Sequence, residues 1–239
     1  IAPGATFVQQ VPITLVAGTT AIQDTDLTIT TTNPAACVTS LNTTLSAQMN
    51  YDVETLSTTT EEFESPITTW NARGAAGSET LASTIWSRRR QAIGDYRMNG
   101  ADYTSGSDTA LESPNLVLGP GSSSITFAHA FDFDALTGPN RYYDGGVIEV
   151  TNNNGATWVD VTTLGAAPGY SGTLEAGTGN ALAGRSAYGG RNSNWPNTNN
   201  VTLNFGNQFA GQTIKIRFRI GTDFVVRTPG AQGWFIDSI

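Results

Sequence analysis

The feature that most constrains this chain is the strict alternation of apolar and polar residues in several short segments. Successive side chains of a β-strand point to opposite faces, so such a segment buries one face and exposes the other. SITFAHAFDFD (124–134) gathers on one face Ile125, Phe127, His129, Phe131 and Phe133. TIKIRFRI (213–220) repeats the pattern with Ile214, Ile216, Phe218 and Ile220 inward. Many such strands, separated by turn residues, predict an all-β fold with a two-sheet jelly roll or β-sandwich.

A β-hairpin is predicted in YYDGGVIEVTNNNGATW (142–158). Asn and Gly tolerate the positive φ angles of tight turns, so Asn152 to Gly155 should form the turn, with Gly155 in a left-handed conformation. The strand before it should add Val147 or Ile148 to the core. Nothing in this hairpin indicates catalysis.

The domain organisation predicted from these patterns has two parts. Residues 1–58 alternate in short runs separated by Thr, Asn and Gly, which is typical of an Ig-like segment or of additional β-strands. Residues 59–239 should form the jelly-roll domain, and the Thr-rich stretch 57–60 marks the boundary. Helical periodicity is weak, and only 81–93 has room for a turn or two.

Composition limits the classes of partner. The chain has 239 residues, a net charge of −8 and a single lysine, Lys215. Nucleic acids and anionic membranes require a basic surface, so neither is expected as a partner. No apolar run approaches the roughly 18 residues of a membrane span. The chain begins at Ile1 with neither an initiator Met nor a signal peptide, so we expect a mature or excised piece of something longer. Secretion is expected from the Thr-, Asn- and Gly-rich composition.

The lone cysteine, Cys37, leaves two interpretations open: a buried free thiol, or a thiol whose partner lies outside this chain.

Catalytic motifs are missing. His129 is the only histidine, which excludes sites that need two, and its position on an apolar strand face predicts a hydrogen-bonded core residue. A Ser-His-Asp triad would need this same histidine, and no Gly-x-Ser-x-Gly elbow accompanies it. Asp132 and Asp134 share a strand face. A paired-acid site is one interpretation, and cross-strand ion pairs with Arg217 and Arg219 are the favoured one.

Ligand-binding residues are the remaining candidates. Calcium prefers carboxylates gathered from loops and strand ends, and Glu62, Glu64, Asp108 and Asp237 occupy such places. Trp195, in a polar loop before a proline, is predicted to be exposed and could serve a sugar platform or anchor the loop. The other tryptophans are predicted to lie in the core: Trp70, Trp86, Trp158 and Trp234.

Seven segments in one order resemble a known family. They are FES (63–65), DTALESPNL (108–116), ITFAHAFDFD (125–134), the hairpin 142–158, NALAGR (180–185), IKIRFRIGTD (214–223) and GWFIDSI (233–239). This order is similar to that of the MAM-like jelly-roll modules C-terminal to secreted bacterial peptidases of the fungalysin and immune inhibitor A types. The resemblance covers about residues 60–239.

The resemblance implies a non-catalytic accessory domain. It also implies a structural calcium ion held by Glu64 and Asp237, with Asp108 as a third ligand. The sequence departs from the family pattern at Ser238, which stands where a second acid is usual.

Three classes of function follow. The first is an extracellular accessory or binding module that recognises protein or carbohydrate at the cell surface. The second is a self-associating, adhesin-like surface or filament subunit that pairs strand edges, with residues 5–16 as a candidate donated strand. The third is an enzyme with an unrecognised carboxylate site. The first is favoured.

Overall fold

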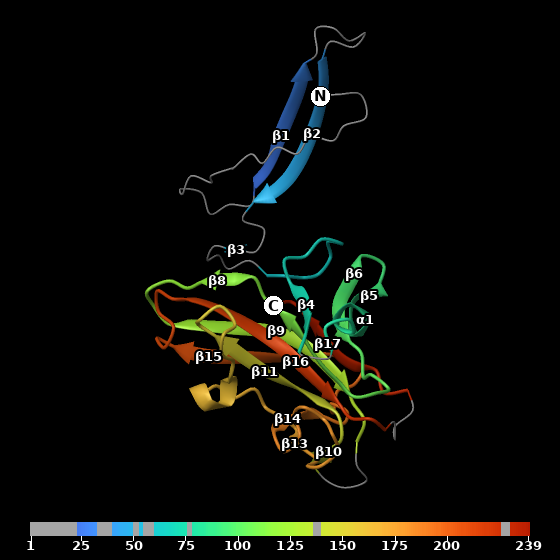
Figure 1. Cartoon of the computed structure of the whole chain (residues 1–239). Helices are drawn as coiled ribbons and strands as arrows, with labels where there is room; N and C mark the ends of the chain where they lie inside the picture. Colours follow the sequence, from blue (N-terminus) through green and yellow to red (C-terminus); the bar gives the residue numbers. More distant parts are fainter. Residues whose placement is uncertain are drawn as a thin grey trace. The chain divides into compact units, whose positions relative to one another are not determined.

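The computed structural model describes residues 23–32, 40–49, 53–54, 60–75, 78–135, 140–225 and 230–239 (Figure 1). The chain divides into two compact units, 1–50 and 51–239. The division falls earlier than the boundary predicted at residue 58, because β3 (Val53–Glu54) pairs with β8 (Asn115–Val117) of the second unit. Cys37 and the segment 5–16 lie outside the described residues.

The described part of the first unit is a single antiparallel pair. It consists of β1 (Gln23–Thr32) and β2 (Ser40–Met49), which pair along their whole length. Most of the predicted Ig-like segment lies outside the described residues, so that prediction stays open.

The described part of the second unit contains two sheets. The larger contains, in spatial order, β10 (Arg141–Tyr142), β13 (Gly172–Leu174), β14 (Ser186–Gly189), β11 (Gly145–Thr151), β16 (Thr213–Thr222), β7 (Ser107–Glu112) and β4 (Asn71–Gly74). β12 (Val159–Asp160) pairs with β11, and β8 pairs with β16. The smaller contains β15 (Asn199–Gly206), β9 (Ser123–Asp132), β17 (Gly233–Asp237), β6 (Asp95–Gly100) and β5 (Trp86–Ala92). The helices among the described residues are α1 (Ala82–Ile85) and the 3₁₀ turn η1 (Val161–Leu164).

Aromatic side chains hold the two sheets face to face. Phe127 of β9 meets Phe218 of β16 with ring centres 5.1 Å apart, and Trp234 of β17 meets the same Phe218 at 5.4 Å. Edge-to-face contacts of this kind add to the burial of apolar area that stabilises a sandwich core. The predicted all-β sandwich is confirmed.

The alternation predicted the core correctly. Fully or nearly fully buried are Phe127, Phe131, Phe133, Ile148, Ile214, Ile216 and Phe218, while Ile125 is half-buried against them. Val147 is also buried, in a small second cluster with Leu174, Leu182 and Ala187. The two neighbours Val147 and Ile148 join different clusters because adjacent strand residues face opposite sides of the sheet.

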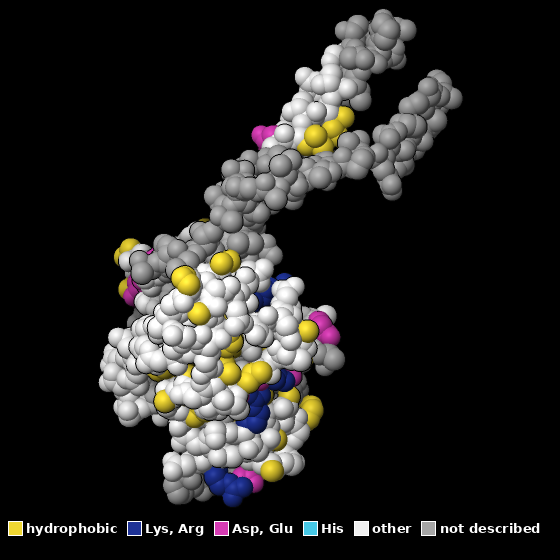
Figure 2. All heavy atoms as spheres, turned by 90° about the vertical axis from the view of Figure 1, so that its left-hand side faces the viewer, with side chains coloured by type: hydrophobic (Ala, Val, Ile, Leu, Met, Phe, Trp, Pro, Cys, Tyr) yellow, Lys and Arg dark blue, Asp and Glu magenta, His cyan; other side chains and the backbone are white. Residues whose placement is uncertain are grey.

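The hairpin prediction also holds in its essentials. β11 pairs with β12 through Glu149–Asp160 and Val150–Val159, and Gly155 has φ = 87°. The returning strand is only two residues long, so most of 152–158 is turn and loop. The surface visible in Figure 2 is mainly uncharged, since charged residues make up only 13% of the chain, with a few clusters of Arg, Asp and Glu.

Candidate functional site

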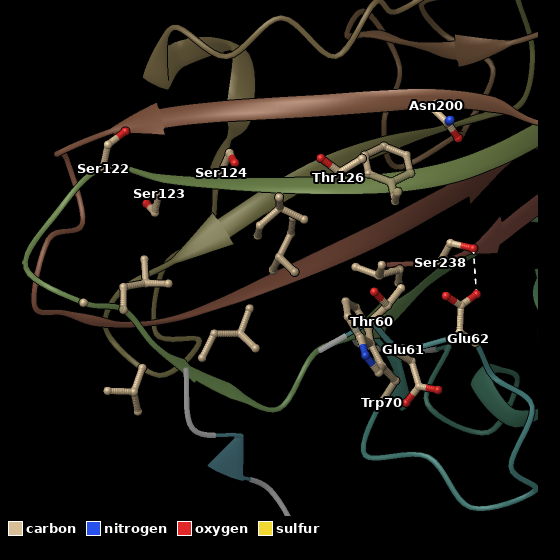
Figure 3. Close-up of a pocket in the computed structure, with 18 of the residues that line it drawn as sticks. Thr60, Glu61, Glu62, Trp70, Ser122, Ser123, Ser124, Thr126, Asn200 and Ser238 are labelled. Atoms are coloured by element: carbon tan, nitrogen blue, oxygen red, sulfur yellow. Dashed lines mark hydrogen bonds between the residues drawn. The ribbon is translucent and has the colours of Figure 1, made fainter. Parts of the chain in front are cut away.

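A groove opens where the smaller sheet is incomplete. It has a volume of about 970 Å³ and lies along the first half of β9, which we call the β9 groove. Its described lining comprises Thr60–Glu62, Trp70, Leu116–Gly119, Gly121–Phe127, Asn200, Ile216 and Ser238–Ile239. Figure 3 shows Trp70, Glu61 and Glu62 near one end and Ser122 and Ser123 towards the other.

Apolar side chains of both sheets contribute to the lining. Trp70 packs against Phe63 and Phe218, with ring centres 6.4 and 5.8 Å apart, so the groove reaches down to the sandwich core. Ile125 and Leu116 pack against the same core and remain half-buried. Val117 is 39% exposed. A concave surface with apolar walls is the usual form of a ligand site.

The polar part of the groove is uncharged except for two carboxylates. Glu61 accepts hydrogen bonds from the Phe63 amide (2.8 Å) and the Thr68 hydroxyl (2.9 Å). Glu62 accepts one from the Ser238 hydroxyl at 2.8 Å, the contact drawn in Figure 3. Among the described lining residues none is basic, so the groove favours neutral or cationic groups.

The backbone amides and carbonyls of β9 point alternately to its two sides, towards β15 and towards β17. Phe131 exchanges hydrogen bonds with Asn192, on the β15 side of the strand. Backbone direction alternates along an antiparallel strand, so Ala128, Ala130 and Asp132 face β17. Their partners there are Asp237, Phe235 and Gly233.

The same alternation directs the backbone amides and carbonyls of Ser124 and Thr126 towards the groove. β17 pairs with β9 only from Ala128 onward, and no other described strand takes its place beside Ser124 and Thr126. Unpaired backbone amides and carbonyls on a strand are the feature that recruits another extended chain.

The end of β17 explains the gap. Ser238 has φ = 49°, a left-handed conformation that turns the chain out of the sheet. Ile239 then exchanges backbone hydrogen bonds of 3.0 and 2.8 Å with Glu61. The beginning and end of this domain therefore lie side by side, as expected, but β9 loses its neighbour.

The Ser123 hydroxyl is a further unpaired group. Its Oγ atom lies in the groove wall, is buried, and has no hydrogen-bond partner among the described residues. An unsatisfied buried hydroxyl costs stability, roughly 1–3 kcal/mol. A ligand that bonds to it recovers that cost.

A cluster of aspartates lies outside the β9 groove. Asp102 accepts a hydrogen bond from the Asp134 amide at 2.9 Å, and Asp144 accepts one from the Asp223 amide at 2.6 Å. Asp102 and Asp144 also bond to each other through their side chains, which requires a shared proton. Burial, reinforced by the neighbouring charges, raises the pKa of Asp144 to about 9 and that of Asp102 to about 6. Asp144 is thus protonated at neutral pH and donates to Asp102.

The Asp102–Asp144 pair has the chemistry of a catalytic acid–base pair but is not accessible from the cavities described. Neither Asp102 nor Asp144 lines the β9 groove or the second cavity beside His129, and Asp144 is 3% exposed. A substrate therefore has no access to the pair through either of these cavities.

Arginines and carboxylates form a network on the larger sheet. Glu149, which is buried, binds Arg185 and Arg217 at 2.6 Å each and Arg219 at 3.3 Å. Burial alone would raise the pKa of Glu149, but the three guanidinium groups hold it below its usual value. Trp158 lies under Arg217, with the guanidinium 4.3 Å from its ring centre, and is half-buried rather than in the core as predicted.

The predicted partners of Asp132 and Asp134 are wrong. Asp132 binds Arg191 at 2.9 Å, and Asp134 is buried beside the Asp102–Asp144 pair. Arg217 and Arg219 lie in the other sheet, so β9 cannot supply their carboxylates.

The three predicted calcium ligands are found in different surroundings. Asp108 on β7 is held by Arg219 through two contacts of 2.7 Å, in the larger sheet. Glu64 accepts a hydrogen bond from the Tyr96 amide at 3.0 Å. Burial and the charges of Glu62 and Asp95 raise the pKa of Asp237 to about 6. Within the described ranges no group of three or more His, Cys, Asp or Glu is arranged to hold a metal ion. The calcium prediction therefore rests on the family resemblance alone.

His129 is a core residue, as predicted. It is 2% exposed, and its Nδ1 accepts a hydrogen bond from the Trp234 indole at 3.1 Å. Burial lowers its pKa to about 4, so it is neutral at physiological pH.

Trp195 lies half-buried over the outer face of the smaller sheet. Its ring is 5.7 Å from that of Phe235, and the Arg191 guanidinium is 5.9 Å from it. We call Trp195, Phe235 and Arg191 the Trp195 patch. It combines the two interpretations open from the sequence, because the ring both anchors its loop and presents an aromatic surface.

No protein-family model matches the chain, and no curated protein matches it. One similar solved structure is described as showing the "structural basis for the promiscuous specificity of the carbohydrate-binding modules from the beta-sandwich super family". It has 10% sequence identity and a TM-score of 0.34, and the match covers 92% of this chain and 74% of that one. A similarity at this level assigns neither a family nor a ligand, so the MAM-like resemblance stays a prediction.

The carboxyl pair generates a prediction about pH. Folded Asp144 keeps its proton up to about pH 9, whereas an unfolded aspartate loses it near pH 3.9. The folded state therefore binds one more proton, and between pH 7 and 9 the free energy of unfolding should fall by up to about 1.4 kcal/mol per pH unit. Urea unfolding at several pH values measures this slope.

The control is Asp144→Asn, which keeps the shape of the side chain and removes its titrating proton. It should abolish the slope between pH 7 and 9, whereas Asp95→Asn, outside the cluster, should preserve it. A slope that persists in Asp144→Asn would show that another group is responsible.

The calcium prediction has a separate test. If Glu64 and Asp237 hold a calcium ion, thermal unfolding should occur at a higher temperature with calcium than with a chelator, because a ligand of the folded state stabilises it. Asp237→Asn should remove the difference. Identical transitions in both media would eliminate the site.

Proposed function

We propose that residues 51–239 form a non-catalytic binding module of a secreted or cell-surface bacterial protein, and that its ligand lies in the β9 groove. The observation that carries the proposal is the combination of an open apolar groove with backbone groups of Ser124 and Thr126 that have no partner among the described residues. An accessory role beside a peptidase is in line with the family resemblance.

The chemistry of the described residues favours binding over catalysis. His129 is buried and neutral, and Glu149 is neutralised by three arginines. The one pair of carboxyl groups that shares a proton opens into neither cavity. None of the helices in the described part of the chain is long and apolar enough to cross a membrane.

The Trp195 patch supports a second candidate ligand, a carbohydrate. Aromatic rings on an open face offer a flat apolar surface, and Arg191 adds hydrogen-bond donors beside it. The patch and the β9 groove involve different side chains, so substitution can separate them.

The proposal is tested by filling the groove. Val117→Trp places a bulky ring on β8 at the groove wall, and Val159→Trp makes the same change on β12, away from it. The two valines are matched, with exposures of 39% and 41%. The full chain is applied to arrays of synthetic peptides and glycans. Binding by the native chain should be lost in Val117→Trp and kept in Val159→Trp.

Two outcomes would contradict the proposal. One is that the native chain binds nothing on either array. The other is that its binding survives Val117→Trp. If glycan binding survives Val117→Trp and is lost in Trp195→Ala, the site is the Trp195 patch.

A further inference from the structure

We infer that the ligand of the β9 groove is an extended segment of a partner protein, which adds to β9 as a strand in the place that β17 leaves at Asp237. This inference rests on the proposed function and specifies its ligand. Four observations lead to it: the open backbone groups, the apolar floor, the Ser123 hydroxyl and the charge of the groove.

The backbone of β9 supplies the main recognition. Ser124 and Thr126 each direct an amide and a carbonyl into the groove, in line with the groups of Ala128 and Ala130 that bind β17. An added strand can therefore continue the existing ladder with no change in β9. Main-chain hydrogen bonds of this kind give affinity in known strand-addition complexes, while alternate side chains give specificity.

The side-chain requirement follows from the pleat. Ser124 and Thr126 are exposed on the outer face, and Ile125 and Phe127 point to the core. Residues of the added strand that lie opposite Ile125 would enter the groove and contact Trp70, Leu116 and Ile216. Their neighbours would point to solvent. The stretch from Ser123 to Phe127 spans roughly 16 Å, so about five residues take part.

The groove also sets the charge of the segment. Glu61 and Glu62 lie at one end, and the described lining has no basic residue. An acidic segment would be repelled, and a neutral segment or one with Lys or Arg at that end would be favoured. A second copy of this chain is less suitable, because both copies would carry a net charge of −8. The buried Ser123 hydroxyl gives the segment one further partner.

The test selects peptides from a random dodecapeptide phage library on the full chain and measures their affinity as synthetic peptides. The selected sequences should alternate apolar and polar residues and lack Asp and Glu. Binding should be lost in Val117→Trp, as for any ligand of the groove.

Two proline variants then test the strand geometry. Ser124→Pro removes an amide that faces the groove and makes no ladder bond with β15, so the fold should persist. Affinity should fall at least about tenfold, since one unmade hydrogen bond leaves a buried partner unsatisfied. Asn204→Pro is the matched control, because Asn204 lies opposite Ser124 and the change removes an outward amide from the exposed edge of β15, so it should leave affinity unchanged. Circular dichroism checks both folds.

A measurement on the peptide keeps the test independent of the protein's stability. Methylation of alternate backbone nitrogens removes peptide donors and leaves the protein intact. Methylation in the frame that faces β9 should abolish binding, and methylation in the other frame should have little effect.

Several results would overturn the inference. They are the absence of any enriched peptide, binding that is insensitive to the methylation frame, and loss of binding in Asn204→Pro but not in Ser124→Pro. Self-association of the native chain that is lost in Ser124→Pro would identify a second copy as the occupant. Glycan binding that is lost in Val117→Trp and kept in Ser124→Pro would overturn the inference, while the proposed function would stand.

Discussion

The contact on which the rest of the structure depends is the aromatic cluster between the sheets. Trp234 lies at its centre, 5.4 Å from Phe218 and 5.3 Å from Tyr188, and donates to His129. Each ring buries a large apolar area, and their geometry fixes how the sheets approach. Because Trp234 belongs to β17, this cluster also fixes β17 between β9 and β6. The position at which β17 ends then decides how much of β9 is covered.

That end point links the fold to the proposed function. The core requires β17 only as far as Ile236, which is fully buried. Beyond Asp237 the chain turns at Ser238 to meet Glu61, and no described strand covers the first half of β9 on that side. Proteins usually cover or blunt such edges, so an open one beside an apolar groove is best explained by a partner. The carboxylates of Glu61 and Glu62 at the groove end repel an acidic partner and favour a neutral or basic one.

The sequence predicted the parts of this structure that depend on local periodicity. Alternation placed Phe127, His129 and Phe218 in the core, and the Asn-Gly turn was recognised from the conformations those residues allow. The prediction from sequence failed for ion pairs between strands that are distant in the chain. Nothing in TIKIRFRI shows that its arginines face Glu149 rather than the aspartates of β9. The alternation was also extended one step too far, since β9 ends at Asp132 and Asp134 turns inward to the carboxyl pair. No sequence pattern predicted the groove, because its open edge depends on backbone groups of β9 and on the place where β17 ends.

The central claim is that the backbone groups of Ser124 and Thr126, which pair with no described strand on the β17 side, are open to a ligand. Residue-resolved amide hydrogen exchange measures this directly. In the free protein the account predicts rapid exchange at Ser124 and Thr126, and strong protection at Ala128 and Ala130, which face β17 on the same side of β9. Phe127, directed to β15, should be protected as well. If Ser124 and Thr126 were protected as strongly as Ala128 and Ala130, the edge would already be occupied and the account would be contradicted.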